Sequence, residues 1–221
     1  MSNQLIIGFA SEGPTDVRFL ASIIQRTFED VAFECESEIE ILPLKIIAKE
    51  PGAFIDVVST YARKADEQGV MVLCIHVDAD AATDVAAFTQ RIDPAFSAVA
   101  DLPKMEYCQN LVAIVPVQMS EAWMLSDKNL LRDEIGTSKS NTELALNKNA
   151  ENFADPKQAI ENAIRTARQG RTQRRRRDLT LSELYQPIGR NIALESLNML
   201  SSYKKFRLAV QESFRKLNYL H

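Results

Sequence analysis

Residues 70–80 read VMVLCIHVDAD, the most apolar run of the chain followed at once by two aspartates. A continuous apolar run of this length is typical of a strand that is buried on both faces, as in a parallel sheet. Asp78 and Asp80 come where that strand would end. Because open α/β sheets bind ligands beyond the carboxyl ends of their strands, the sequence predicts that these two carboxylates face a functional site.

Two other apolar runs also end in acidic residues. Residues 5–10 (LIIGFA) lead into SEGPTD, which carries Glu12 and Asp16, and residues 111–117 (LVAIVPV) lead into QMSEAW, which carries Glu121. A fourth run, residues 40–49, contains Pro43 and is expected to form a short or edge strand. The acidic residues are therefore expected to meet at one edge of a sheet.

The segments between these runs have helical periodicity. Residues 16–28, 52–68 and 81–100 each predict a helix, so the order is β-α-β-α-β-α-β. This order favours an α/β fold with an open, mostly parallel sheet flanked by helices and right-handed crossovers. The sheet domain is expected over residues 1–126, with Trp123 as a core anchor between it and the C-terminal part of the chain.

The character of the chain changes after residue 126. Residues 127–221 are polar and helix-prone, so we expect an α-helical C-terminal part. It is predicted to contain a surface loop over residues 141–152, a helix over residues 156–168, and one or two helices within residues 192–220.

Composition excludes several classes of protein. The 221 residues are 46% hydrophobic and 25% charged, which is ordinary for a globular protein, and the net charge of −4 argues against a protein that simply coats nucleic acid. Three scattered cysteines and two histidines favour reduced core thiols over a zinc site or disulfides. No signal segment and no apolar run of about 18 residues are evident, so a cytoplasmic protein without membrane contact is expected.

The acidic residues suit divalent-metal chemistry. Carboxylate oxygens are the ligands that Mg²⁺ and Mn²⁺ prefer, and two such ions can activate a water and stabilise a leaving oxygen at a phosphodiester. Asp78 and Asp80 would share one side of an extended backbone as the principal metal pair. Glu12 would act as a metal ligand or general base, Asp16 as a ligand of a second ion, and Glu121 as a supporting ligand.

Each of these residues also has a plainer interpretation. Glu12 or Asp16 could cap a helix, and Glu121 could pair with an arginine. Asp84, one turn beyond Asp80, is expected to cap a helix. His76 shares the side of Asp78 in the strand and is expected to be a satisfied core histidine, or a neighbour of the ligands, and not a ligand itself.

A basic run is the other unusual feature. RQGRTQRRRR, residues 168–177, places six arginines within ten residues of a net acidic chain. Arginine offers several donors to phosphate and stays charged, so a surface that holds a nucleic-acid backbone is expected; a helix end or a face for an acidic partner is the alternative. The run comprises Arg168, Arg171, Arg174, Arg175, Arg176 and Arg177.

An early strand that ends in Glu-Gly, then a helix, then a later strand that ends in Asp-x-Asp resembles the TOPRIM domain over residues 4–125. The resemblance implies that Glu12, Asp78 and Asp80 are the metal-binding residues. Asp16 is similar to the extra acidic ligand of OLD-family nucleases, and Ser120-Glu121 is similar in placement to their later one. PVQMSEAWMLSD also resembles small stand-alone TOPRIM-like proteins that are paired with AAA or ABC-type ATPases in phage defence.

The chain departs from the TOPRIM proteins that it resembles in ways that restrict the function. Its 221 residues are expected to leave no space for the further domains of topoisomerases and primases. They contain no GxxxxGK[ST] sequence for nucleotide phosphates, so an ATPase is expected to be a separate chain. The C-terminal lysine of this nuclease group has three candidates, Lys204, Lys205 and Lys216.

We therefore expect a metal-dependent endonuclease that cleaves DNA or RNA, with tRNA among the candidate substrates and a homodimer as a candidate assembly. It would be the effector of a two-component antiviral-defence or toxin system. Two alternatives remain open: a non-catalytic subunit that docks on an ATPase, and a nucleotide phosphohydrolase.

Overall fold

A computed structural model describes residues 3–169 and 179–220, and its centre is a parallel sheet. Strands β2 (Ile7–Ala10), β4 (Lys45–Ile46), β5 (Val72–His76) and β6 (Leu111–Ile114) pair in the order β4-β2-β5-β6. Strands β1 (Asn3–Leu5) and β3 (Ile39–Ile41) form a second parallel pair just before β2 and β4 in the chain. The α/β class with a parallel sheet is therefore confirmed, and β4 lies at the sheet edge, as expected.

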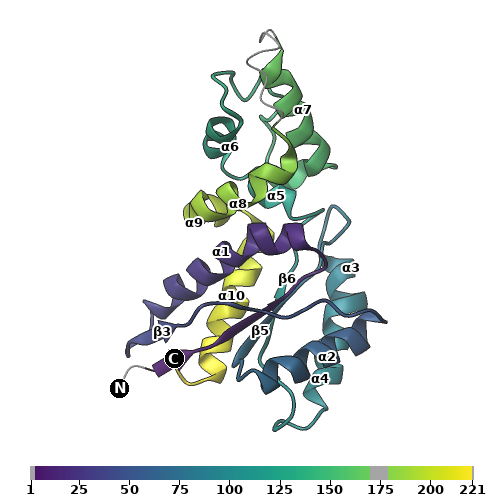
Figure 1. The fold of residues 1–221 in the computed structure, drawn as a ribbon, viewed down its shortest axis with the longest axis vertical. Helices are drawn as coiled ribbons and strands as arrows, with labels where there is room; N and C mark the ends of the chain where they lie inside the picture. The colour runs from purple at the N-terminus through teal and green to yellow at the C-terminus, as the bar shows by residue number, and fades with distance from the viewer. Residues whose placement is uncertain (1–2, 170–178, 221) are drawn as a thin grey trace.

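Helices cover both faces of this sheet (Figure 1). Helix α1 (Pro14–Ala32) lies on one face, and α2 (Phe54–Glu67) lies on the other with α4 (Asp93–Ala100). Between β5 and α4 the chain forms a short helix α3 (Val85–Ala87) and a π-helical turn η1 (Phe88–Ile92). The central strands β2, β5 and β6 are buried because apolar side chains pack on them from both sides.

The C-terminal half is helical and extends the molecule along its long axis (Figure 1). It consists of α5 (Glu121–Met124), α6 (Lys128–Ile135), the 3₁₀ turn η2 (Ala150–Asn152), α7 (Pro156–Arg168), α8 (Leu181–Asn191), α9 (Leu194–Leu197) and α10 (Ser201–Lys216). The helix expected over residues 156–168 is confirmed. The surface loop expected over residues 141–152 is only partly right, since Leu144 and Leu146 are buried in the core.

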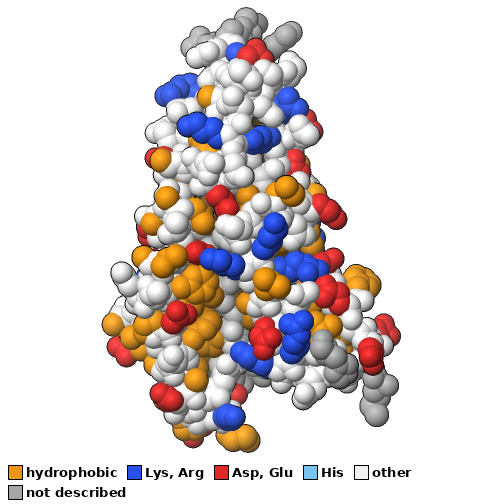
Figure 2. Space-filling view, turned by 180° about the vertical axis from the view of Figure 1, so that it is seen from behind, with side chains coloured by type: hydrophobic (Ala, Val, Ile, Leu, Met, Phe, Trp, Pro, Cys, Tyr) orange, Lys and Arg blue, Asp and Glu red, His pale blue; other side chains and the backbone are white. Residues whose placement is uncertain are grey.

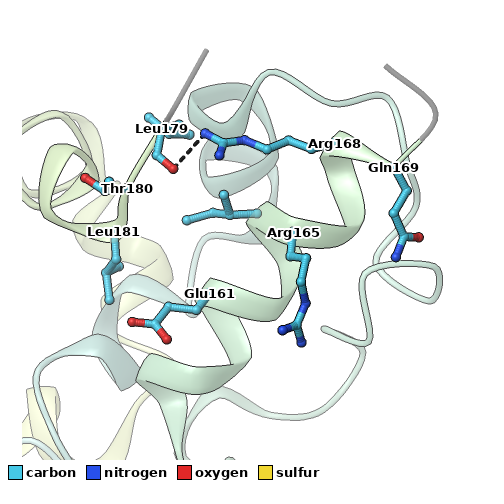
Figure 3. A pocket seen from close by; sticks show the side chains of 8 residues that line it. Glu161, Arg165, Arg168, Gln169, Leu179, Thr180 and Leu181 are labelled. Carbon is cyan, nitrogen blue, oxygen red and sulfur yellow. Dashed lines mark hydrogen bonds between the residues drawn. The ribbon is translucent and has the colours of Figure 1, made fainter. Parts of the chain in front are cut away.

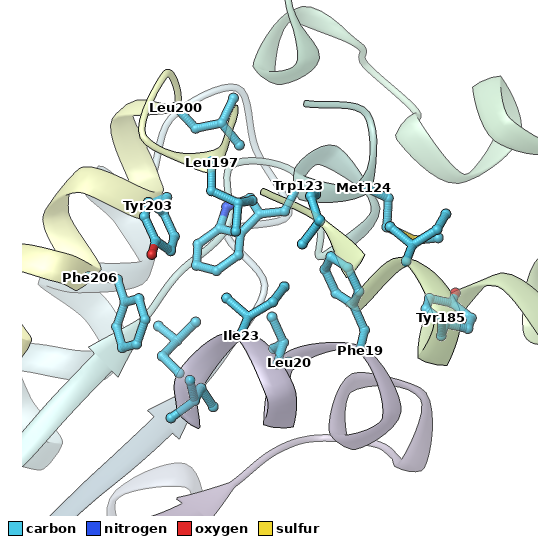
Figure 4. Packing of buried hydrophobic residues seen from close by; sticks show 14 of the residues in the cluster. Phe19, Leu20, Ile23, Trp123, Met124, Tyr185, Leu197, Leu200, Tyr203 and Phe206 are labelled. Atoms are coloured by element: carbon cyan, nitrogen blue, oxygen red, sulfur yellow. The ribbon is translucent and has the colours of Figure 1, made fainter. Parts of the chain in front are cut away.

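The last helix returns to the sheet. Helix α10 packs on β6 and α1, on the same face as α1 itself. Trp123 is fully buried there; its indole donates to the Ser202 hydroxyl at 2.8 Å and its ring meets Tyr203 edge-on at 5.3 Å (Figure 4). Trp123 is therefore the core anchor that the sequence predicted, and the helices after residue 126 share one hydrophobic core with the sheet.

The remaining sequence expectations concern cysteines and membranes. Cys35, Cys74 and Cys108 are all free, and burial raises the pKa of each thiol, that of Cys108 to about 11. Over the described residues, every helix is too short or too polar to cross a bilayer.

Candidate active site

Three strand ends meet at the carboxyl edge of the sheet. Asp16 lies in the first turn of α1 after β2, Asp78 lies two residues beyond β5, and Ser120 precedes α5 after β6. The Ser120 amide donates to Asp78 Oδ1 at 2.9 Å, and the Ser120 hydroxyl lies 3.3 Å from the same oxygen and 3.2 Å from Asp16 Oδ1. Two of the predicted ligands are thus brought together around one serine.

The Ser120 hydroxyl cannot satisfy all of its neighbours. It also lies 3.1 Å from His76 Nε2, which is itself 3.3 Å from Asp78 Oδ1. A hydroxyl carries one proton, so it can donate to only one of the two carboxylates. The cluster of Asp16, Asp78, His76 and Ser120 therefore holds more acceptor oxygens than its own protons can serve.

Because the two aspartates are largely buried, leaving their oxygens without hydrogen-bond donors is costly in free energy. The side chains of Asp16 and Asp78 are only 14% and 24% exposed. Burial raises the pKa of Asp16, and the nearby charges of Asp78 and Glu12 raise it further, against an opposing effect of His76. Burial alone would lower the pKa of His76, but its hydrogen bond and charge interaction with Asp78 raise it overall. The site therefore favours binding of a cation or proton.

Glu12 lies at the same edge but is already paired. Its carboxylate accepts from Arg91 of the π-helical turn at 2.5 Å, and its backbone carbonyl accepts from Lys49. The Arg91 guanidinium lies over the Phe54 ring, 4.8 Å from its centroid. Glu12 is 44% exposed and could exchange Arg91 for another cation without unfolding.

Glu121 is buried and held by the helical part. It accepts a hydrogen bond from the hydroxyl of Tyr185 on α8. Burial raises the pKa of Glu121, and the Tyr185 hydrogen bond offsets part of that rise. Its partner is a tyrosine, so the alternative that it pairs with an arginine is wrong.

Asp80 is not brought into the cluster. Its φ of 51° is left-handed, whereas the expected sharing of one side with Asp78 requires an extended backbone. The strand-like pairing continues past β5, since the Asp80 amide donates to the Gln118 carbonyl at 2.8 Å, and the chain turns there. The Asp80 side chain is exposed and has no hydrogen bond to the described residues.

Asp84 does not cap its helix through its side chain, contrary to expectation. It is buried and accepts from Lys205 of α10 at 2.6 and 2.7 Å. Of the three candidate lysines, Lys205 thus has a defined carboxylate partner, on the segment that follows Asp80.

The Ser120, His76 and Asp16 side chains resemble a nucleophilic triad, with His76 Nδ1 3.9 Å from Asp16 Oδ2. Acyl transfer needs donors aimed at a developing oxyanion, however, and here Asp78 lies against the same hydroxyl. A second carboxylate would repel that oxyanion. The geometry suits cation binding better than serine nucleophilic catalysis.

Of the six arginines in the basic run, the structure describes only Arg168. Arg168 donates to the Leu179 carbonyl at 2.7 Å and lines a pocket with Arg165 and Glu161 (Figure 3). The other members lie outside the described residues: Arg171, Arg174, Arg175, Arg176 and Arg177.

The described residues hold no group of three or more His, Cys, Asp or Glu side chains already arranged around a common metal position. Comparisons with protein-family models, with curated proteins and with solved structures gave no significant match.

Sequence reasoning missed three side chains at this edge. Lys49 lies in the loop after β4, Arg91 in η1 and Tyr185 in α8, and none of them lies in an acidic motif. Only Lys49 carries a signal that could have found it: it is the last residue of the run 40–49 that is expected to form a strand, so it follows the same rule as the acidic residues.

Proposed function

We propose that this chain is a divalent-metal-dependent phosphodiesterase of the nuclease class, with a TOPRIM-like site. The observation that carries the proposal is the convergence of Asp16 and Asp78 on Ser120 and His76 from the ends of three parallel strands. Two carboxylates alone repel a phosphate. A nearby divalent cation reverses that repulsion, which is why this donor set supports phosphate chemistry only with a metal.

The donor set fits Mg²⁺ or Mn²⁺ in its chemistry. Asp16 and Asp78 would hold the ion, and Glu12 would join them after it leaves Arg91, since all three are oxygen ligands. When bound, the ion would supply an activated water and charge stabilisation at phosphorus. Asp80 could reach the site only after a change at its left-handed backbone, so it is the least supported of the expected ligands.

The other residues at the site would position the metal ligands and compensate part of their charge. Ser120 orients Asp78 by donating from its amide to Oδ1. His76 is buried behind the two aspartates and compensates part of their charge. Tyr185 holds Glu121 beside them, which ties the helical part to the site.

The experiment is a cleavage panel on the full chain. Plasmid DNA, tRNA and free nucleotides are incubated with Mg²⁺, Mn²⁺ or EDTA, using wild type, Asp78→Ala, Asp16→Asn and the control Asp133→Ala, an exposed acid on α6. We expect cleavage of a polynucleotide that needs metal, falls at least about 100-fold in both site variants, and is unchanged in the control.

The panel also separates the alternatives. Hydrolysis of free nucleotides alone would make the chain a nucleotide phosphohydrolase. Absence of all metal-dependent cleavage, with or without a co-expressed ATPase of the AAA or ABC type, would contradict the nuclease proposal and favour a non-catalytic docking subunit. The proposed place in a defence or toxin system depends on such a partner, which the same co-expression tests.

A further inference from the structure

A pocket of about 230 Å³ lies beside the aspartate cluster, on the α2 side of the sheet. It is formed where β2 and β5 are neighbours, although the chain passes from β2 to β4 before it returns to β5. This reversal of strand order is where open α/β sheets bind ligands. The volume is below the ~300–1,000 Å³ of typical drug-sized ligand sites, so the pocket can enclose part of one nucleotide unit and not a duplex.

Two cations at the mouth of this pocket are incompletely used. Lys49 donates to the Glu12 backbone carbonyl and has no carboxylate partner among the described residues. Arg91 shares its charge with the Glu12 carboxylate, on the exposed side of the pocket. A phosphate is the ligand that both side chains bind best, since it accepts several charge-assisted hydrogen bonds at once.

His76 lies between the pocket and the aspartate cluster. It is among the residues that line the pocket, but its Nδ1 lies 3.9 Å from Asp16 Oδ2 and its Nε2 lies 3.1 Å from the Ser120 hydroxyl, so the imidazole faces the aspartate cluster. The groups at the pocket that can bind an anion are therefore the side chains of Lys49 and Arg91.

One wall of the pocket is apolar, and the remaining lining includes Ser11, Tyr61 and the acids Glu12 and Glu50, of which Glu50 is paired with Lys64. Phe54 presents its ring under Arg91, and Val57, Ile75 and Ala10 close the wall. An aromatic ring beside a guanidinium is a surface on which a planar base can stack. The pocket therefore combines donors for a phosphate with an apolar wall for the organic part of its ester.

We propose that this pocket binds a nucleoside monophosphate unit, either as a free mononucleotide or as the phosphorylated end of a strand. Its phosphate would contact Lys49 and Arg91, and its base would lie against Phe54. Arg91 then has two alternative partners: the Glu12 carboxylate without ligand, and the phosphate with it. The biological role as a substrate subsite rests on the proposed function, but the binding itself does not require catalysis.

The test is isothermal titration calorimetry on the full chain in EDTA, with AMP, adenosine and inorganic phosphate as probes. We expect AMP to bind at least about tenfold more tightly than adenosine or phosphate alone, since it uses both halves of the pocket. Lys49→Ala should weaken AMP binding about tenfold. Glu12→Gln should tighten it several-fold, because Arg91 loses its competing partner.

Lys45→Ala is the matched control. Lys45 precedes Lys49 in the same segment and also donates to a backbone carbonyl, that of Gln68, but it does not line the pocket. The Lys45→Ala variant should bind AMP like wild type. Equal AMP affinity in wild type and Lys49→Ala, or equal binding of adenosine and AMP, would overturn the proposal.

Two further arms identify the source of the ligand and separate the two proposals. Tighter binding of a 5′-phosphorylated trinucleotide than of AMP would assign the pocket to strand ends, and equal or weaker binding to free mononucleotides. Asp78→Ala should still bind AMP in EDTA while it loses cleavage in Mg²⁺. AMP binding without any nuclease activity would therefore refute only the proposed function.

Discussion

Ser120 is the residue on which the site depends, because its amide and hydroxyl contact groups from two other strand ends. It orients Asp78 and shares its one proton among Asp16, Asp78 and His76. Such a cluster is stable only if protons or a cation offset the paired carboxylates. This predicts a characteristic dependence of stability on pH when metal is removed.

In EDTA, the free energy of unfolding should decrease as pH rises above 6.5. The folded-state pKa of His76 lies above the ordinary histidine value of 6.5, so its stabilising charge is fully present below that pH and is lost as pH passes the folded-state pKa. The raised pKa of Asp16 acts in the same direction at lower pH. Denaturant titrations between about pH 5.5 and 8.5 measure the effect.

The control for this measurement is Asp78→Asn, which removes the main interactions that raise the pKa of His76. The decrease should be much smaller in this variant. The chain has only two histidines, so few other groups titrate in this range. Stability that rises with pH in wild type, or an unchanged slope in the variant, would show that His76 and Asp78 do not form this cluster.

Tyr185→Phe should destabilise the protein by about 1–3 kcal/mol at pH 8, because a buried carboxylate loses its donor. The cost should be smaller at pH 5. Because burial already raises the pKa of Glu121, its carboxyl is more readily protonated, and therefore neutral, at pH 5. Denaturant titrations at both pH values measure this; a cost that is equal at both would contradict it.

Tyr107→Phe serves as its control, since the Tyr107 hydroxyl has no hydrogen bond to the described residues and the side chain packs at the edge of the hydrophobic cluster around α2 and α4. Tyr107→Phe should therefore lower the free energy of unfolding only slightly at either pH.

At the scale of single residues, the sequence predicted which acidic residues lie at strand ends. It did not predict which of their side chains lie close together. Asp78 and Asp16 converge as expected. Asp80 differs because alternation along a strand holds only while the backbone stays extended, and a left-handed residue ends that alternation. The partners Arg91 and Tyr185 lie 79 and 64 positions from the acids they bind, and no local pattern identifies such pairs.

At the scale of elements, α1 and α8 make the most extensive helix–helix contact in the part of the chain that the structure describes. Gly189 of α8 lies directly over Phe19 of α1, and a Cβ there would meet the Phe19 carbonyl oxygen and lie 2.9 Å from its carbon. Arg26 of α1 also donates to the Gly189 carbonyl at 2.9 Å. The contact places Tyr185, one turn earlier on α8, beside Glu121.

Gly189→Ala should therefore destabilise the protein by about 1–3 kcal/mol, since backbone atoms of one helix would have to move away from the other. Thermal unfolding measures the loss. Gln186→Ala, an exposed change on the same helix, should leave the melting temperature nearly unchanged. An equal effect of the two substitutions would mean that the helices are not in close contact.

The sequence predicted most elements of the sheet part because apolar runs and helical periodicity are strong local signals. Helix α8 was not predicted, since Pro187 lies inside it and its Gly189 is unfavourable in a helix. The π-helical turn that presents Arg91 also lacks a recognisable signal.

At the scale of the molecule, the sheet part and the helical part are joined through one core. Trp123, Tyr203 and Phe206 pack together, with Ile23 of α1 nearby in Figure 4. The face shown in Figure 2 has positive and negative side chains interspersed with apolar ones, in keeping with the small net charge. The division at residue 126 thus marks a change of secondary structure within a continuous core.

Residues 1–126 alone should not form a stable native state. Without α10 and α8, the apolar faces of β6, α1 and Trp123 would be exposed to water, at about 25 cal/mol per Å² of apolar surface. We expect no cooperative unfolding transition and strong binding of a hydrophobic dye by the fragment. A fragment that unfolds cooperatively with native near-ultraviolet circular dichroism would contradict this expectation.

Asp16 and Asp78 are proposed to form a divalent-metal site, and the proposed chemistry depends on it. Calorimetric titration of the full chain with Mn²⁺ at pH 7.5 tests it most directly, with Asp133→Asn as control. We expect saturable binding in wild type and control that weakens at least about tenfold in the double variant Asp16→Asn, Asp78→Asn. Identical Mn²⁺ binding by wild type and the double variant, or no binding at all, would contradict the metal site.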